Sequence, residues 1–236
     1  MQTKRTILAA AISLLIGNHA IAASESVQDQ TGTDNVADVV QQGDSSSVTQ
    51  RQNGTANVVF TEQRGVGLTA ESDQVGSGNI SVTDQSGSNG SVAISQDGQY
   101  NLATILQSSV GVGQSAAISQ AGISNLAYIE QLDGAGNAAT ISQNGQRNAT
   151  EVFQVGRLGK RYTGVQSGDG NTAFIEQSGS ASADTEQTGT ANVIRLTQDG
   201  FPYGAYASIS QNGTGNEATL DQRSGGRYSS GDVALV

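Results

Sequence analysis

The sequence lacks the residues on which most compact or catalytic proteins depend. Its 236 residues include no cysteine, no tryptophan, one proline, one methionine and one histidine, and only 4% are aromatic and 35% hydrophobic. Without cysteine there is no disulfide and no thiol nucleophile. So little apolar volume cannot build a thick central core, and we expect a freshly made monomer to be disordered or slow to fold. Backbone pairing and regular stacking must supply the stability.

Positive charge is also scarce. Eleven Lys and Arg stand against 21 Asp and Glu, giving a formal net charge of −10. This balance argues against nucleic acid as a partner, because binding to phosphates requires clusters of Lys and Arg. The acidity would keep the unassembled chain in solution.

The first 22 residues have the pattern of a signal peptide. Lys4 and Arg5 precede an apolar stretch over residues 6–17, and Ala20-Ile21-Ala22 fits a small-x-small cleavage site. Cleavage after Ala22 removes two positive charges and no acid, so the mature net charge becomes −12. Cleavage also removes His19, which leaves no residues for a Ser-His-Asp triad or a conventional zinc site. We expect neither a cofactor nor a metal.

What the sequence does contain is a long series of phased glutamines. The first eight are spaced by eleven residues, later steps vary from ten to thirteen, and glycine usually follows two places after each glutamine. The series comprises Gln30, Gln41, Gln52, Gln63, Gln74, Gln85, Gln96, Gln107, Gln120, Gln131, Gln143, Gln154, Gln166, Gln177, Gln187, Gln198, Gln211 and Gln222.

Asparagine adds a second rhythm, five places after every other glutamine. The repeat is therefore about 22 residues long and consists of two half-units, and a fixed period in this range marks a solenoid or array. Nine repeats are counted from Asn35, Asn57, Asn79, Asn101, Asn125, Asn148, Asn171, Asn192 and Asn216.

Within each half-unit the residues alternate with period two, which indicates a β-strand. Asn125, Ala127, Ile129 and Gln131 share one face, which we assign to the interior, and the residues between them share the other. Glycine-containing segments between strands suit tight arcs. We therefore predict an all-β fold, a parallel β-solenoid of about nine strand-arc-strand coils forming two facing sheets, about 43 Å long at about 4.8 Å per coil.

The amide side chains need a physical reason to lie inside, because a buried amide without a partner costs about 1–3 kcal/mol. In parallel stacking, identical side chains lie one coil apart, so each amide can donate to one neighbour and accept from the other. The alternative, solvated amides on a polar surface, does not explain their phasing with the apolar positions.

The repeat Gln-x-Gly-x-x-Asn-x-Ala-x-x-x-Gln resembles the curlin repeat of curli subunits, the extracellular amyloid proteins of bacterial biofilms. The signature extends over residues 30–222. Five copies match it best, at residues 30–41 (QTGTDNVADVVQ), 96–107 (QDGQYNLATILQ), 120–131 (QAGISNLAYIEQ), 166–177 (QSGDGNTAFIEQ) and 211–222 (QNGTGNEATLDQ).

This resemblance implies a biological role and partners. It implies a subunit that is kept unfolded in the periplasm with the help of chaperones, passes through a dedicated outer-membrane secretion pore, and polymerises at the cell surface with itself and with other curlin subunits. Residues 23–29 would be the segment read by the secretion machinery. The product would be an extracellular fimbria that supports biofilm matrix and adhesion.

The family has two subunit types, and the sequence leaves the choice between them open. The segment 125–131 resembles the minor nucleator, whereas 218–222 resembles the major fibre subunit. Nine repeats also exceed the five of the best-known members.

Some copies are irregular. Ser109 replaces the usual glycine, Arg157, Lys160 and Arg161 bring positive charge into one half-unit, and Pro202 lies in a long step where we expect a bulged arc. Residues 223–236 lose the phase and form a C-terminal tail.

Two other functions were weighed against a structural fibre. A soluble adhesin or other binding solenoid would need a uniform outward array, which Leu126, Tyr128 and Glu130 do not form with their counterparts. A glycosidase would need paired acids, and the pairs Asp184 with Glu186 and Asp34 with Asp38 are better explained as parts of a solvated face. We therefore expect a non-enzymatic structural subunit.

Overall fold

The protein is a stack of short β-strands, described by a computed structural model over residues 24–156, 159–200 and 204–223. Eighteen strands are found in this part of the chain. They are β1 Glu25–Thr33, β2 Val36–Gln42, β3 Ser47–Thr55, β4 Val58–Val66, β5 Thr69–Ser77, β6 Ile80–Ser88, β7 Ser91–Gln99, β8 Leu102–Val112, β9 Ser115–Ile123, β10 Leu126–Leu132, β11 Ala138–Gln146, β12 Ala149–Val155, β13 Arg161–Asp169, β14 Thr172–Ser178, β15 Ala181–Thr190, β16 Val193–Asp199, β17 Ala205–Thr214 and β18 Glu217–Arg223.

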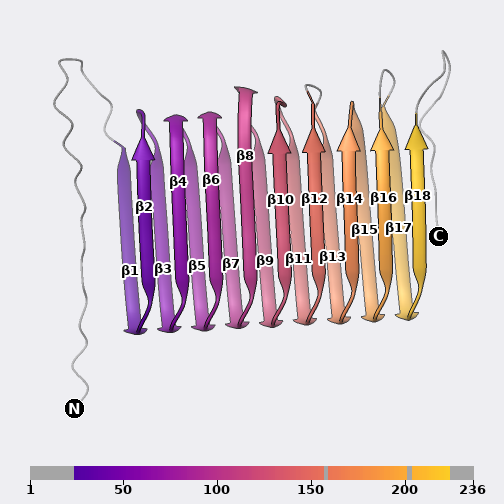
Figure 1. The fold of residues 1–236 in the computed structure, drawn as a ribbon, viewed down its shortest axis with the longest axis horizontal. Coiled ribbons are helices and arrows are strands. Elements are labelled where there is room, and N and C mark those ends of the chain that lie inside the picture. The colour runs from indigo at the N-terminus through magenta and orange to yellow at the C-terminus, as the bar shows by residue number, and fades with distance from the viewer. Residues whose placement is uncertain (1–23, 157–158, 201–203, 224–236) are drawn as a thin grey trace.

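The strands form two sheets that face each other along the whole molecule (Figure 1). All odd-numbered strands lie in one sheet, from β1 to β17, and all even-numbered strands lie in the other, from β2 to β18. Every pairing within each sheet is parallel. One odd strand and the even strand that follows it make one coil, and we number the coils 1 to 9. The predicted parallel β-solenoid with two facing sheets is confirmed.

The register places equivalent residues of successive coils side by side. Gln120 pairs with Gln143 in one sheet, and Gln131 pairs with Gln154 in the other. Insertions and deletions fall between strands, with one exception: the register of β6 against β8 shifts between Ser86 and Ser88. Repeats of unequal length therefore keep the same strand register.

The arcs on the two sides of the solenoid differ. Every arc from an odd to an even strand has two residues, and the second is always one of the phased asparagines. Ser124 and Arg147, the first residues of two such arcs, have φ of 57° and 53°, so the turn uses a left-handed residue. Arcs on the opposite side vary in length and carry the insertions.

The core is one layer of aliphatic side chains between the sheets. Ile105, Ile129 and Ile175 each have 0% exposure, and alanine occupies the neighbouring inward positions. The core also holds Tyr162, which fits because Gly164 leaves it room: a Cβ at Gly164 would lie 2.2 Å from the Tyr162 hydroxyl oxygen. Burial raises the pKa of that hydroxyl, which lies 2.8 Å from the Thr185 hydroxyl.

Several predicted segments lie at or beyond the limits of the described residues. The predicted signal peptide, Arg157, Pro202 and the tail after Arg223 lie outside them. Residues 25–29 of the predicted secretion segment form the first half of β1, and their role in secretion stays a prediction. In the part of the chain that the structure covers, no helix has the length and apolarity needed to cross a membrane.

The layered core predicts that alanine substitution at two adjacent residues of β14 has very different effects on the free energy of unfolding. Ile175 is buried between the sheets and Glu176 points outward into solvent. Ile175→Ala should lower the free energy of unfolding by about 2–5 kcal/mol, since it removes buried methyl groups and leaves a cavity. Glu176→Ala should change it by less than about 0.5 kcal/mol. Urea denaturation of the soluble folded protein measures both, and equal effects would contradict this inside-outside assignment.

Candidate functional site: the amide columns and the ends of the solenoid

Two columns of glutamine side chains run through the interior, one along each sheet. In each column the Nε2 of one glutamine donates to the Oε1 of the glutamine in the next coil, at 2.6–3.0 Å. One column consists of Gln30, Gln52, Gln74, Gln96, Gln120, Gln143, Gln166, Gln187 and Gln211. The other consists of Gln41, Gln63, Gln85, Gln107, Gln131, Gln154, Gln177, Gln198 and Gln222.

Most of the glutamine amides also donate to the backbone of the facing sheet. Gln143 Nε2 donates to the Leu126 carbonyl oxygen at 2.9 Å as well as to Gln166 Oε1 at 2.8 Å. Both amide protons and the carbonyl oxygen therefore find partners inside the protein. This removes the cost of burying a polar group with unmet hydrogen bonds.

A third column is made by the asparagines of the two-residue arcs. The Oδ1 of Asn125 accepts from both the backbone N–H and the Nδ2 of Asn148, at 3.1 and 3.2 Å. Asn148 Nδ2 then reaches forward to the Gly168 carbonyl oxygen at 3.0 Å. The same pattern joins Asn35, Asn57, Asn79, Asn101, Asn125, Asn148, Asn171, Asn192 and Asn216.

The glycines that follow the odd-strand glutamines make this close approach possible. Gly122 lies within β9 with φ of +122°, and a Cβ there would lie 1.9 Å from the Gly145 carbonyl oxygen of the next coil. The sequence predicted these glycines in the arcs between strands. Instead, each is the second-last residue of an odd strand, at a contact between backbones that has no room for a side chain, and the left-handed arc residue comes two positions later.

The columns have a direction, so the two ends of the solenoid differ. Glutamine Nε2 always donates from one coil to the next, whereas asparagine Nδ2 donates back to the Oδ1 of the preceding coil. Coil 1 therefore presents the Oε1 atoms of Gln30 and Gln41. Coil 9 presents the Oδ1 of Asn216, which is exposed and follows the last asparagine–asparagine bond.

Further interior polar residues were not singled out in the sequence. Gln28 Nε2 donates to Gln50 Oε1 at 3.1 Å, and Gln50 Nε2 donates to the Thr61 hydroxyl at 3.0 Å. Both glutamines lie two places before a phased glutamine, on the same face of the strand. That period-two relation was the signal that could have found them.

The varied arcs hold a shorter polar column, also missed. The Lys160 N–H donates to Asn137 Oδ1 at 3.2 Å, which repeats the asparagine geometry on the opposite side of the solenoid. Lys160 is 2% exposed, its Nζ donates to the Gly156 carbonyl oxygen at 2.7 Å, and burial lowers its pKa. Asn137 lies six residues before Gln143, just as Asn125 lies six before Gln131, and that spacing was the available signal.

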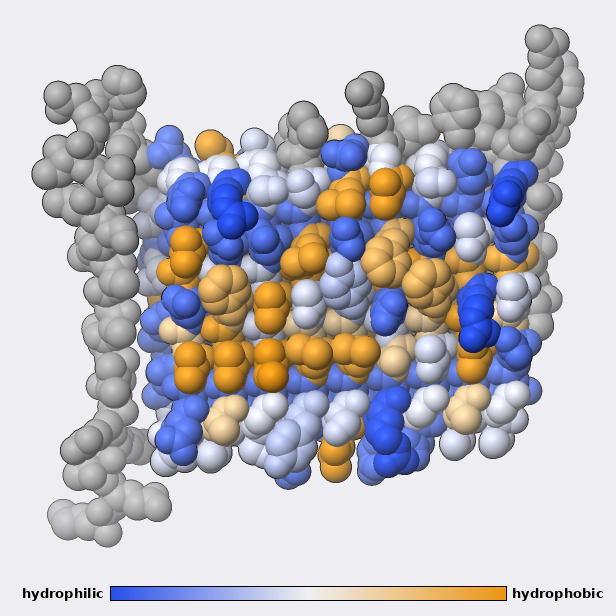
Figure 2. Space-filling model, in the orientation of Figure 1, coloured by the Kyte–Doolittle hydropathy of each residue, from blue (hydrophilic) through white to orange (hydrophobic). Residues whose placement is uncertain are grey.

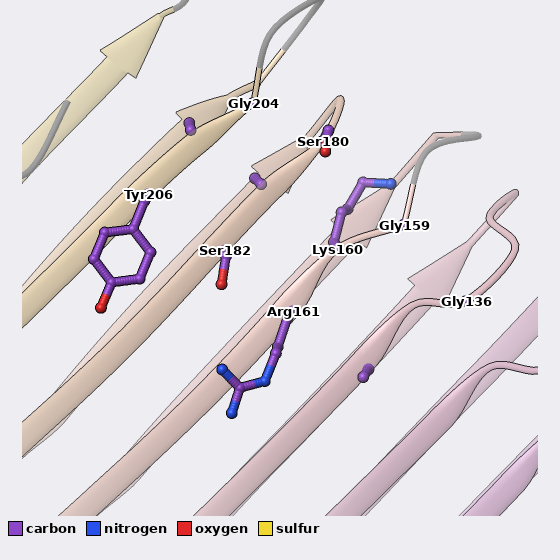
Figure 3. A pocket seen from close by; sticks show the side chains of 11 residues that line it. Gly136, Gly159, Lys160, Arg161, Ser180, Ser182, Gly204 and Tyr206 are labelled. Carbon is purple, nitrogen blue, oxygen red and sulfur yellow. The ribbon is translucent and has the colours of Figure 1, made fainter. Parts of the chain in front are cut away.

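A shallow groove of about 560 Å³ lies on the outside of the odd-numbered sheet, near coils 6 to 9. Figure 3 shows Arg161, Ser182 and Tyr206, which line it, on three successive odd strands, whereas the Lys160 side chain points away from them. The Arg161 guanidinium lies 3.7 Å from the Asp184 carboxylate, which also accepts from the Tyr206 hydroxyl at 3.4 Å. These groups satisfy one another on the surface and form no nucleophile-base arrangement.

The acid pairs considered for catalysis lie on the surface. Asp184 and Glu186 point outward from β15, while Asp34 occupies an arc and Asp38 points outward from β2. Within residues 24–223, as far as they are described, no cluster of three or more His, Cys, Asp or Glu could hold a metal. Most of the acids that approach arginines do so at exposed positions, where an ion pair contributes about 0–1 kcal/mol.

Comparison with known protein families gives one match. Residues 115–145 match the model of the curlin associated repeat. This segment comprises β9, β10 and most of β11, so it holds the whole of coil 5, with Gln120, Asn125 and Gln131, and reaches Gln143 of coil 6. No curated protein matches the chain. The chain therefore contains a curlin repeat, and the proteins built from this repeat are structural rather than catalytic.

The asparagine column predicts that an interior member matters more than a terminal one. Asn148→Ala removes the acceptor of the Asn171 N–H and Nδ2 and the donor to the Gly168 carbonyl. Each buried group left without a partner costs about 1–3 kcal/mol, so we expect a loss of about 3 kcal/mol. Asn216→Ala, at the exposed end, should cost less than about 1 kcal/mol in the soluble protein. Urea denaturation compares the two, and equal losses would show that the column contributes little.

Proposed function

We propose that this curlin-repeat chain is a structural subunit of an extracellular, curli-like amyloid fibre, which grows by end-to-end stacking of solenoids. The observation that carries the proposal is the complementarity of the two ends. Coil 1 and coil 9 expose opposite halves of the same hydrogen-bond pattern, and neither end of the described solenoid carries a helix or a strand that covers it. Unpaired strand edges of this kind pair with other chains.

The side chains of the last coil fit those of the first coil of a second copy. If the register continues, Gln211 Nε2 meets the Oε1 atom of Gln30. Asn216 Oδ1 then accepts from the N–H and Nδ2 of the second copy's Asn35, as every interior asparagine does. The contact is heterologous, so it repeats without closing and gives a filament.

The backbone extends the same pattern. The first residue of each even strand donates its N–H to the asparagine carbonyl of the following coil, as Val193 does to Asn216 at 2.7 Å. The equivalent residue of coil 9 is Glu217, whose N–H would reach the Asn35 carbonyl of the next copy. Strands perpendicular to the growth direction, about 4.8 Å apart, define a cross-β fibre.

The cellular part of the proposal rests on the repeat and on the N-terminal sequence. The N-terminal sequence supports a cleaved signal peptide. The likeness to curli subunits supports chaperoned passage through the periplasm, export through an outer-membrane curli pore, and a surface location with a role in biofilm matrix and adhesion. Other curlin subunits would copolymerise through the same end contacts, because those contacts are made by the repeat itself.

The direct test uses the mature chain, residues 23–236, purified in denaturant and then diluted into buffer. We expect amyloid-dye binding after a lag, filaments in electron micrographs, and diffraction spacings near 4.8 Å and about 10 Å. A protein that stays monomeric and never binds the dye would overturn the proposal.

A second experiment distinguishes the two subunit types. Trace amounts of this chain are added to a related curlin subunit. If this chain alone assembles after an ordinary lag, the result favours the major fibre subunit. If this chain, tethered to a surface, removes the lag of the related subunit, the result favours the nucleator.

A single backbone substitution at the last coil should block growth without unfolding the subunit. Glu217→Pro removes an N–H that has no role inside one copy, at the first residue of an edge strand, where proline is tolerated. Each junction would then leave the Asn35 carbonyl without a donor, at about 1–3 kcal/mol, so elongation from preformed seeds should fall roughly tenfold.

Glu217→Ala is the matched control. It removes the same exposed ion pair with Arg195 but keeps the N–H. Seeded elongation at the wild-type rate is expected for this variant. If the proline variant also elongates at that rate, the end-to-end contact is not the one described above.

A further inference from the structure

The outer face of the even-numbered sheet carries a row of aliphatic side chains that runs without a break through coils 1 to 6, is interrupted by Thr172 in coil 7 and resumes at Val193 in coil 8. The first residue of each even strand points outward, and in seven of the nine coils that residue is Val, Ile, Leu or Ala. Figure 2 shows the row crossing the face from coil to coil. We call it the apolar stripe: Val36, Val58, Ile80, Leu102, Leu126, Ala149 and Val193.

Aromatic side chains lie beside the stripe on the same face. Tyr128, Phe153 and Phe174, from coils 5, 6 and 7, are in contact, with ring centroids 5.5 Å apart in each pair. The exposed fractions of Val36, Ile80 and Phe174 are 53%, 40% and 37%. Large exposed apolar areas of this kind mark interaction surfaces.

The fold itself does not require the stripe. The equivalent outward positions of the odd-numbered sheet are mostly polar or small, among them Ser47, Thr69, Ser91, Ser115 and Ser182. Both sheets have the same strand pairing and the same inner columns, so the difference belongs to the outer surface alone.

We propose that the apolar stripe and its aromatic neighbours bind the same face of a second copy, so that two solenoids pair side by side. The strands stay nearly parallel along the molecule (Figure 1), which makes the face flat enough for sheet-on-sheet contact. Nine coils at about 4.8 Å and seven residues at about 3.3 Å give roughly 1,000 Å² per partner, above the ~800 Å² of a standard interface. The inference extends the proposed fibre, in which each stacked copy would add its own length of stripe, separated from the next by Glu217 of coil 9.

An antiparallel arrangement makes the face self-complementary. When the two coil 5 faces meet and the solenoids run in opposite directions, coil 4 meets coil 6, coil 3 meets coil 7 and coil 2 meets coil 8. Larger side chains then face smaller or apolar ones, and an arginine faces an aromatic ring. The apolar and aromatic facing pairs are Leu102 with Ala149, Ile80 with Thr172, Val58 with Val193, Leu106 with Phe153, Val82 with Phe174, and Phe60 with Arg195. Arg64 faces Asp199, whereas Asp84 faces Glu176 and Glu130 faces its own copy, so two like-charged pairs oppose the contact.

The charges on this face favour a second copy over an anionic partner. Nine outward acids and three arginines surround the stripe, so a phospholipid surface of negative charge or a polyanion would be repelled. Two copies repel each other as well, but salt screens that term and leaves the apolar contact unchanged. Side-by-side pairing should therefore strengthen between about 10 mM and 150 mM salt, where the screening length falls from about 30 Å to about 8 Å.

The test compares three mature chains of known net charge. One is the wild type, one carries Ile80→Glu with Leu126→Glu in the stripe, and the control carries Thr69→Glu with Ser115→Glu at the matched positions of the odd sheet in coils 3 and 5. Filament width and bundling are read by electron microscopy and pelleting, while seeded dye kinetics report end-to-end growth. We expect equal growth for all three, with paired filaments for the wild type and control and single filaments for the stripe variant.

The two proposals fail in different ways. Filaments whose pairing is the same in the stripe variant as in the wild type, or is lost equally in the control, would overturn the side-by-side contact and leave the fibre intact. If no chain forms filaments, the fibre proposal fails, and sedimentation of the soluble protein then tests the side-by-side contact. Dimers of the wild type and the control, but not of the stripe variant, would support that contact. Monomers of all three chains would overturn it. Flotation of the wild type with phosphatidylglycerol vesicles would also overturn it.

Discussion

The structure depends on one constraint: a buried amide must find hydrogen-bond partners on both sides, and only an identical coil above and below supplies them. Gln143 shows this in full, with its Oε1 accepting from Gln120 and its Nε2 donating to Gln166. A globular protein would fill its centre with apolar side chains. This chain fills much of its centre with amides, whose hydrogen-bond partners are in place only while the strand register is kept. Slipping one coil by one residue would break three amide columns at once.

That constraint explains where the chain is uniform and where it varies. The two-residue arcs never change length, because the asparagine column passes through them and the glycine contact, such as Gly122 against Gly145, lies two positions before them. The arcs on the other side carry no such unbroken column and take the insertions. It also explains the open ends: a column of amides has no natural last member, so the outermost coil resembles an interior coil with one neighbour removed.

The period of the glutamines and the alternation within each half-unit were enough to predict the fold, because a parallel solenoid repeats one local solution nine times. The sequence was less informative about features that occur in only one or a few coils. It did not reveal the column of Asn137 and Lys160, whose spacing signal rests on a single asparagine. It also did not reveal the fit of the Tyr162 ring over Gly164 and the glycines' place inside strands, which depend on how side chain and backbone atoms approach in space. The apolar stripe was visible only after the outward residues of successive coils were aligned by the structure.

The central claim is that coil 9 of one copy continues in register with coil 1 of the next. It is tested most directly by cross-linking, because the chain has no cysteine of its own. Asp29 and Ser210 occupy the same outward column, at opposite ends of the solenoid, so Asp29→Cys and Ser210→Cys chains would lie about 4.8 Å apart across a junction, within disulfide range. Fibres grown from an equal mixture and then oxidised should yield the mixed dimer and neither symmetric dimer. Symmetric dimers, or no cross-link in fibres that bind dye, would contradict the account.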